Sequence, residues 1–222
     1  GNTVTIAAGE LVINGGTFNA GSTIGGVTGT GGAIDVSTSS AVYVQQHTTN
    51  LPIKVTVNDG LFTAAIPFYQ EAGANEKDGK TSAPQLVDLA ISGGTFTSNC
   101  SVEVGGVSVK SADKTNFITG GTFSSDPSAY VAERYKVTRL EGGKYQVVAL
   151  FAGGTGTADD PFVIQNAEQL KAFRNNVNAG NTFAGKTVKL TRDINLKNEE
   201  WTPIGTNEHP FSGSFDGQNH TV

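Results

Sequence analysis

The first half of the chain alternates apolar and polar residues over short runs, a pattern typical of strands with one buried face. The clearest runs are Ile53-Lys54-Val55-Thr56-Val57, Val102-Glu103-Val104 and Val107-Ser108-Val109. A period of two places every second side chain on the same face of a strand. Because Gly and β-branched residues outnumber the strong helix formers in most windows, the pattern predicts many short strands rather than a helical bundle.

A tetrad of residues recurs at the ends of these apolar runs. Its copies are Gly15-Gly16-Thr17-Phe18, Gly93-Gly94-Thr95-Phe96 and Gly120-Gly121-Thr122-Phe123, with Asp59-Gly60-Leu61-Phe62 as a degenerate copy. Glycine permits backbone conformations that are closed to other residues, so the repeat indicates a recurrent corner. We expect each Phe to turn inward and to stack on its equivalent one coil away.

The spacing of the four Phe residues sets the expected coil length. The intervals are 44, 34 and 27 residues, which we interpret as two coils, one coil with an insertion, and one coil of about 20 to 27 residues. The excess in the middle interval coincides with Ile66 to Pro84, where charged residues lie among Gly and Ala. This stretch is predicted to be a loop that leaves the solenoid.

The pattern changes after Phe123. Tyr135–Leu140 and Tyr145–Val148 flank Glu141-Gly142-Gly143-Lys144 and predict a hairpin. An open solenoid end exposes unpaired strand edges, and a terminal hairpin would cover them. We therefore predict an all-β chain made of a parallel β-helix with its capping hairpin over residues 1–150 (hairpin region 124–150), a linker at 151–156, and a second β-rich module at 157–222.

The second module opens with a predicted helix. Asn166 is a suitable N-cap and Gln169 its capping-box partner, while Gly180 ends the pattern. Leu170, Phe173 and Val177 share one face of this helix. Short strands are predicted next, and they are Thr187–Leu190, Ile194–Leu196, Trp201–Ile204 and Phe211–Phe215.

Composition narrows the class of protein. The chain has 222 residues, 29 Gly, 37% hydrophobic and 16% charged residues, and a net charge of −5. The acidic balance and scattered basic residues disfavour nucleic-acid binding, and no apolar run is long enough to insert into a membrane. With no Met, and an end at Val222 inside an expected strand, we expect a piece of a longer protein. Cys100 stands alone, so we expect a small, partly buried residue.

The second module contains a recognisable set of stretches, namely Gly156–Ile164, Ala167–Leu170, Val188–Leu190, Asp193–Leu196, Trp201–Gly205 and Phe211–Thr221. Together they resemble the opening of GLUG-type β-helical modules, which occur in large surface proteins of gut bacteria. The Gly-Gly-Thr-Phe coils and residues 124–148 resemble repeats and a capping segment in surface proteins of gut Firmicutes. The resemblance implies a right-handed parallel β-helix, a location on the cell surface or in the secreted fraction, and an adhesive or host-interacting role.

Residue patterns that would support catalysis or metal binding are weak. Asp159 and Asp160 are adjacent, so on an extended segment they point to opposite sides and cannot form a facing acid–base pair. Asp35, Asp59, Asp88 and Asp113 could approach one another across coils, but Asp59 and Asp113 fall in a turn and a loop. His47, His209 and His220 do not have metal-ligand spacing. We therefore predict no catalytic residues, no metal site and no cofactor.

Two segments are better candidates for ligand binding, because aromatic side chains beside charges are common in binding surfaces. The first is the stretch from Ile66 to Pro84, with Phe68, Tyr69, Glu71, Glu76, Lys77 and Asp78. The second is a strand that would present Tyr43, Gln45 and His47 on one outward face.

The favoured function is therefore that of a non-catalytic, adhesin-like segment that binds a host protein, with immunoglobulin as one candidate, or a glycan. A carbohydrate-active β-helix enzyme, either a polysaccharide lyase or a glycoside hydrolase, is the first alternative. A structural stalk is the second.

Overall fold

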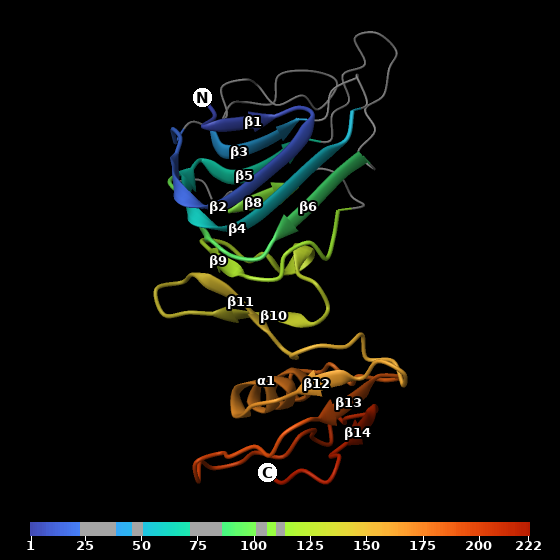
Figure 1. Ribbon diagram of the computed structural model, residues 1–222. Coiled ribbons are helices and arrows are strands. Elements are labelled where there is room, and N and C mark those ends of the chain that lie inside the picture. Colours follow the sequence, from blue (N-terminus) through green and yellow to red (C-terminus); the bar gives the residue numbers. More distant parts are fainter. Residues whose placement is uncertain (23–38, 46–50, 72–85, 101–105, 110–113) are drawn as a thin grey trace. The chain divides into compact units, whose positions relative to one another are not determined.

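The computed structural model describes residues 1–22, 39–45, 51–71, 86–100, 106–109 and 114–222 (Figure 1). The chain is mostly β-structure and divides into two compact units, Gly1–Val148 and Ala149–Val222. The sequence-based boundary lies after residue 150, with a linker at 151–156. Leu150, the last residue of the predicted first domain, and Phe151, the first residue of the predicted linker, are buried in the core of unit 2, at 1% and 2% exposure.

Unit 1 contains two sheets built largely from parallel strands (Figure 1). The first has the order β1-β3-β5-β8, and the second has the order β10-β11-β9-β7-β4-β2, with β6 also pairing with β4. Successive passes of the chain alternate between the two sheets, so each strand pairs with a strand from the next pass. The first sheet comprises β1 (Val4–Ile6), β3 (Ser40–Gln45), β5 (Ile66–Glu71) and β8 (Val107–Val109). The second comprises β2 (Gly9–Asn19), β4 (Ile53–Ala64), β6 (Val87–Ile91), β7 (Thr95–Ser98), β9 (Gly121–Phe123), β10 (Tyr135–Arg139) and β11 (Tyr145–Ala149).

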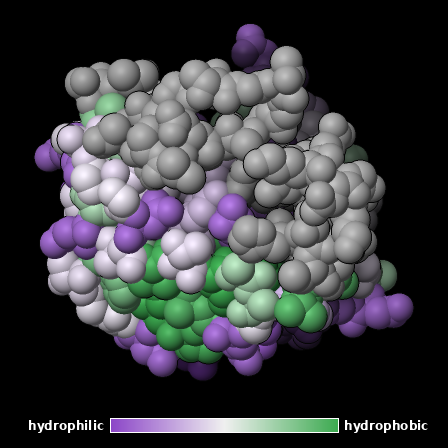
Figure 2. All heavy atoms as spheres, turned by 90° about the horizontal axis from the view of Figure 1, so that it is seen from above, coloured by the Kyte–Doolittle hydropathy of each residue, from purple (hydrophilic) through white to green (hydrophobic). Residues whose placement is uncertain are grey.

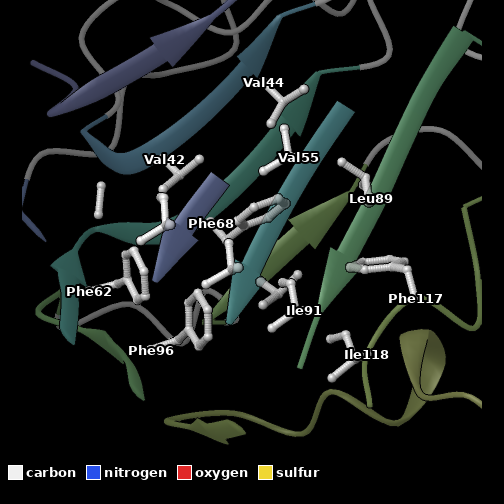
Figure 3. Close-up of a cluster of buried hydrophobic side chains, with 14 of the residues drawn as sticks. Val42, Val44, Val55, Phe62, Phe68, Leu89, Ile91, Phe96, Phe117 and Ile118 are labelled. Atoms are coloured by element: carbon white, nitrogen blue, oxygen red, sulfur yellow. The ribbon is translucent and has the colours of Figure 1, made fainter. Parts of the chain in front are cut away.

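The core of unit 1 lies between these sheets, and alternation fills it as expected (Figure 3). In β4, Ile53, Val55 and Val57 are at most 1% exposed, whereas Lys54 between them is exposed. The predicted strand at Val107–Val109 is confirmed as β8. The one predicted at Val102–Val104 falls outside the described residues.

The four tetrad Phe residues form one continuous stack, which confirms the predicted packing. Ring centroids are 5.0 Å apart for Phe18 and Phe62, 4.6 Å for Phe62 and Phe96, and 4.9 Å for Phe96 and Phe123, and adjacent rings are within 9° of parallel. Phe18 is directly opposite Phe62 in the β2–β4 register. The interval of 44 residues is therefore one pass of the chain, and its interpretation as two coils is wrong.

The first glycine of the tetrad leaves room for the backbone of the preceding pass. A Cβ placed on Gly93 would lie 2.3 Å from the carbonyl oxygen of Asn58, and one on Gly120 would lie 2.1 Å from that of Ser92. Asp59 occupies the equivalent position in the degenerate copy. There the β2–β4 register shifts by one residue around Asn14, and Asp59 Oδ1 accepts the N–H of Gly60 at 2.8 Å.

A hairpin ends the second sheet, as predicted. Leu140 donates its N–H to the carbonyl of Lys144 at 2.7 Å to close the turn, and β11 pairs antiparallel with β9. Val147 is buried against the core of unit 1. The hairpin therefore changes a parallel stack into an antiparallel pair at this end of the sheet.

The interpretation of Ile66 to Pro84 as one protruding loop is wrong for its first part. Ile66–Glu71 forms β5, an inner strand of the first sheet between β3 and β8. The β-branched and aromatic residues there follow β4 after a single residue, Ala65, which is too short a connection for a loop. Residues 72–85 lie outside the described part of the chain.

Unit 2 contains β12 (Phe162–Ile164), α1 (Ala167–Asn178), β13 (Thr187–Leu190) and β14 (Ser214–Asp216), with a parallel sheet in the order β12-β13-β14. The predicted helix is confirmed. The Asn166 side chain accepts a hydrogen bond from the Gln169 N–H at 2.9 Å, and Leu170, Phe173 and Val177 are buried. Gln169 reaches back to the N–H of Gln165, one residue before the expected partner.

Two of the strands predicted in unit 2 are wrong, and a third is displaced. Neither Ile194–Leu196 nor Trp201–Ile204 forms a strand. At the first of them, the Asn195 side chain accepts the N–H of Lys197 at 2.7 Å, and the chain turns with Lys197 and Asn198 at positive φ. Of the strand predicted at 211–215, only the end lies in β14.

The N-cap of α1 gives a testable contribution to the stability of unit 2. We expect Asn166→Ala to lower its free energy of unfolding by about 1 kcal/mol, because an N–H at the start of the helix loses its acceptor. Fluorescence of Trp201, the single tryptophan of the chain, would monitor unfolding in urea. The matched control, Asn176→Ala, makes the same substitution further along the same helix and should be neutral or slightly stabilising. Equal losses in both variants would contradict a capping role.

Candidate binding surfaces

The two segments predicted to bind ligands converge on one face of the first sheet. In the parallel register of β3 and β5, Tyr43 is opposite Tyr69 and Gln45 is opposite Glu71. The tyrosine rings stack with centroids 5.7 Å apart and an interplanar angle of 19°. Val44 of β3 points into the core and is fully buried, so the tyrosines lie on the opposite, outer face. We call this the tyrosine face.

Phe68 and Tyr69, the two aromatic residues of the predicted loop, lie in a strand instead. Phe68 is fully buried in the core of unit 1 (Figure 3), and it pairs in register with Val42 and Val107. Tyr69 is 1% exposed. Phe68 therefore has no surface for a ligand, and Tyr69 supports Tyr43 rather than presenting its own ring. Tyr43 and Gln45 are half-buried and are the accessible members of the tyrosine face.

The remaining predicted binding residues are less well placed. The backbone of Glu71 ends β5 beside Gln45, whereas His47, Glu76, Lys77 and Asp78 lie outside the described residues. The tyrosine face is thus formed by two strands, and its two tyrosines, Tyr43 and Tyr69, are 26 residues apart in the sequence. No sequence pattern indicates this pairing, since the two segments differ in composition.

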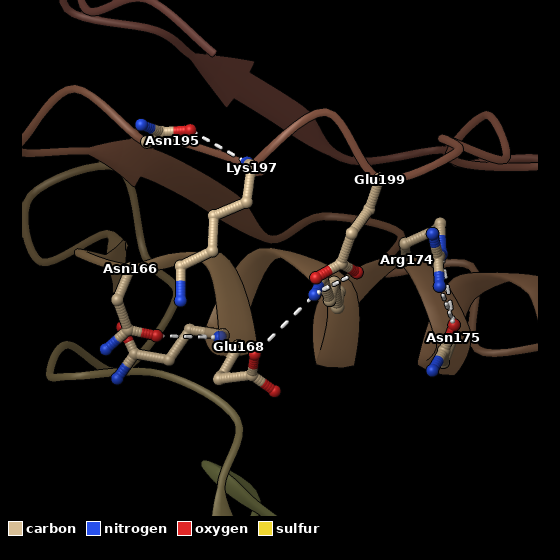
Figure 4. A network of polar contacts seen from close by, with 9 residues as sticks. Asn166, Glu168, Arg174, Asn175, Asn195, Lys197 and Glu199 are labelled. Atoms are coloured by element: carbon tan, nitrogen blue, oxygen red, sulfur yellow. Dashed lines mark hydrogen bonds and ion pairs between the residues drawn. The ribbon is translucent and has the colours of Figure 1, made fainter.

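A second candidate, which the sequence did not indicate, is a shallow pocket of about 200 Å³ in unit 2. It lies between the first turn of α1 and the irregular segment after β13 (Figure 4). The pocket is lined by Asn166, Ala167, Glu168, Lys171, Asn195, Leu196, Lys197 and Glu199. Its lining combines charged side chains of both signs with the apolar Ala167 and Leu196.

Lys171 organises the charges of this pocket. Its Nζ lies 2.6 Å from Glu199 Oε2 and 3.6 Å from Glu168 Oε1. The hydrogen bond with Glu199 raises the pKa of Lys171 above 10.5 and lowers the pKa of Glu199 below 4.5. The pair is therefore ionised across the neutral range, and it ties the segment after β13 to α1 although the two residues are 28 positions apart.

Beside the pocket, Arg174 lies over the ring of Trp201, with its Cζ 4.7 Å from the ring centroid. The same guanidinium donates two hydrogen bonds to Asn175 Oδ1, at 3.0 and 2.9 Å (Figure 4). The contact holds the half-buried Trp201 against the helix. The strand predicted from the sequence at this tryptophan is thus replaced by side-chain contacts to α1.

His220 makes a side-chain contact that links two segments of unit 2. Its Nδ1 lies 3.1 Å from Asp193 Oδ1, and the same oxygen accepts the Thr221 N–H at 3.0 Å. These contacts join the end of the chain to the segment that follows β13. The backbone hydrogen bond from Thr221, followed by the hydrogen bond with His220, lowers the pKa of Asp193 below 3.8.

The lowered pKa of Asp193 predicts an acid-dependent loss of stability in unit 2. The unfolded chain takes up a proton near pH 3.8 while the folded chain stays charged, so the contribution is present above that pH and is lost as pH falls through the folded pKa. We expect the difference between the urea midpoints of the chain and of Asp193→Asn, followed by Trp201 fluorescence, to shrink between pH 5 and about 2. A difference that is constant over this range would contradict the assignment.

Among the described residues, no three His, Cys, Asp or Glu side chains gather into a group that could hold a metal ion. In the same part of the chain, no helix is long and apolar enough to cross a membrane.

Comparison with known proteins gives one partial similarity. A protein of Evansella cellulosilytica named "Putative Gly-rich membrane protein" is 32% identical over 75 residues, which are 33% of this chain and 9% of that protein. The match thus spans less than a tenth of that relative's length. No family model matches the sequence, and no solved structure is similar.

Proposed function

We propose that the chain is a non-catalytic, adhesin-like binding segment of a large bacterial cell-surface protein, which holds a host protein or a glycan on the tyrosine face of a rigid β-solenoid. The observation that carries this proposal is the convergence of Tyr43 and Gln45 with the strand that bears Tyr69. Stacked aromatic rings beside polar side chains bind protein partners and sugar rings well, since the rings lose little conformational entropy.

The β-solenoid interpretation of unit 1 is supported by its strand pairing. Parallel strands recur in two sheets from pass to pass, and the Phe stack keeps one register over four passes. Such a scaffold fixes surface residues because each strand is held by its neighbours and by a packed core. A binding face on β3 and β5 would then be preformed, which limits the entropy cost of binding.

A surface location is supported by two findings. The partial relative in Evansella cellulosilytica carries a name that places it in a membrane. The second is the resemblance of the coils and of unit 2 to modules of bacterial surface proteins. We propose that unit 2 is a GLUG-type module and that the chain lies outside the cell.

The test is a binding screen of the chain against host immunoglobulins, mucins and a glycan array. We expect a saturable ligand whose affinity falls by at least about tenfold in Tyr43→Ala, as for a central aromatic contact. The matched control is Tyr145→Ala, which removes another half-buried tyrosine, on β11 of the second sheet. Circular dichroism of both variants would establish that unit 1 is still folded.

Other results of the binding screen would favour another site or one of the alternative functions. Binding that is equally strong in both variants would place the ligand elsewhere, with the pocket beside Lys171 as the next site to test by Glu199→Gln. Turnover of a glycan would replace the proposal with a carbohydrate-active enzyme. The absence of any ligand would favour a structural stalk.

A further inference from the structure

Among the described residues, no further strand pairs with the N-terminal edge of unit 1. β1 and β2 are the end strands of their sheets in the described part of the chain, and Val12 is 49% exposed. Phe18, the first ring of the stack, has a ring on one side only and is half-buried. Figure 2, seen from above, shows apolar residues gathered on this side of the molecule next to polar ones. The edge therefore offers backbone groups and an apolar surface together.

Charges along the second sheet alternate up to this edge. Asp88 is paired in register with Lys54, and Lys54 is paired with Glu10 of β2. The Lys54 Nζ lies 2.9 Å from Glu10 Oε1, and both carboxylates raise the pKa of the lysine, Glu10 more than Asp88. The charges of Asp88, Lys54 and Glu10 are therefore negative, positive and negative in this order. A side chain that complements Glu10 from its other side would be basic.

A ladder of side-chain hydrogen bonds also runs to the edge. Ser92 Oγ donates to Asn58 Oδ1 at 3.0 Å, and Asn58 Nδ2 donates to Asn14 Oδ1 at 2.7 Å. Every donor points toward the N-terminal edge, so the next group in the ladder would be an acceptor for Asn14 Nδ2. Asn14 is exposed.

The edge also has room for one more pass of the chain. A Cβ added to Gly93 or to Gly120 would lie within 2.3 Å of a carbonyl oxygen of the preceding pass, whereas a Cβ at Gly15 would meet nothing within 4 Å. The tetrad at β2 thus has the same residues as those at β7 and β9. The space that the preceding pass fills beside Gly93 and Gly120 is open beside Gly15.

We propose that this edge binds one further coil of the same repeat, in parallel register, with a basic side chain opposite Glu10, a side-chain oxygen opposite Asn14 and a Phe on Phe18. The inference uses the solenoid interpretation but not the ligand of the tyrosine face. A second copy of the chain fits less well. Two β2 strands meeting about a twofold axis would be antiparallel, which separates their Phe rings, and Glu10 is the only charged residue of β2.

A register-matched fusion tests this proposal. β4 itself contains the required residues, namely Lys54, Asn58 and Phe62. In the native chain, Phe68 of β5 comes four positions after Ala64, the last residue of β4. Phe68 and Val4 are both partners of Val42. A copy of residues 53–64 placed directly before Gly1 therefore puts Val4 four positions after the copied Ala64, which reproduces the native connection.

We expect the fused segment to slow hydrogen exchange of Gly9–Asn19 by at least about tenfold, because amides at an open edge gain partners. The charge requirement is tested with four fused proteins. The copy of Lys54 is either kept or changed to glutamate, and each version is made with Glu10 and with Glu10→Lys. Protection should be greater in the two proteins with opposite charges than in the two with like charges. Trp201 fluorescence would show that unit 2 is the same in all four.

Unchanged exchange in β2 of the fused chain would overturn the proposal, and so would equal protection in all four proteins. Protection of β2 in the unfused chain that rises with protein concentration would assign the edge to a second copy instead. None of these measurements involves the ligand of the tyrosine face. A failed binding screen would therefore leave this result intact, and the reverse also holds.

Discussion

Replacing Phe96 with alanine should lower the free energy of unfolding of unit 1 by about 3–5 kcal/mol, the range for a buried aromatic side chain whose cavity cannot collapse. Phe96 is fully buried, and its ring stacks on Phe62 at 4.6 Å and on Phe123 at 4.9 Å. The neighbouring strands are fixed by backbone pairing on both sides, so they cannot move in to fill the gap. Urea unfolding followed by hydrogen exchange of unit 1 peptides would measure the loss.

Phe18→Ala is the matched control for this prediction. The same ring in the same stack has one ring neighbour and is half-buried, so its removal should cost only about 1–2 kcal/mol. Trp201 fluorescence should report an unchanged unit 2 in both variants. Equal losses at Phe96 and Phe18 would mean that the stack adds little beyond ordinary burial.

The second large effect is expected at Gly120. The added Cβ of Gly120→Ala would lie 2.1 Å from the carbonyl oxygen of Ser92, which is backbone and cannot rotate away. The β7 and β9 strands must separate locally, and we expect a loss of about 3 kcal/mol in unit 1. Hydrogen exchange of the 121–123 strand and of the hairpin strand that pairs with it would show where the structure opens.

Gly15→Ala separates this steric effect from the general cost of removing a glycine. Gly15 holds the same tetrad position but has open space around it, so only its φ of +154° opposes alanine. We expect a loss of about 1 kcal/mol. If Gly15→Ala were as damaging as Gly120→Ala, the close approach of the preceding backbone could not be the reason for glycine in the tetrad.

The Phe stack was predictable because residue type determines it. A large ring after a pair of glycines has few ways to pack other than inward, and each copy has the same local form. The length of a pass was not predictable, because insertions between strands leave no mark on the tetrads. Phe18 and Phe62 are thus direct neighbours although they are 44 residues apart.

The error at β5 has a different cause. Composition over a long window placed Phe68 and Tyr69 with the charged residues that follow them, while the strand itself is only six residues long. In unit 2, capping residues located α1 well, since a helix start depends on nearby side chains. The strand expected at Ile194 failed because the Asn195 side chain bonds to the backbone of Lys197 and competes with strand pairing.

The candidate sites were only partly accessible from the sequence. Alternation placed Tyr43 and Gln45 on an outward face, and the register with β5 then brought Tyr69 beside Tyr43. The pocket around Lys171 depends on Glu199, which reaches the helix through an irregular segment with two residues at positive φ. No periodic pattern marks such a contact.

The regular ring spacing and irregular chain length of the Phe stack together define how unit 1 would respond to tension. A force that pulls the two ends of unit 1 apart along the stack would break the hydrogen bonds between parallel strands in sequence, one pass at a time. Each pass would release a different length, roughly 150, 120 and 95 Å for 44, 34 and 27 residues. Under tension, unit 1 would thus extend in a graded series of steps of unequal length.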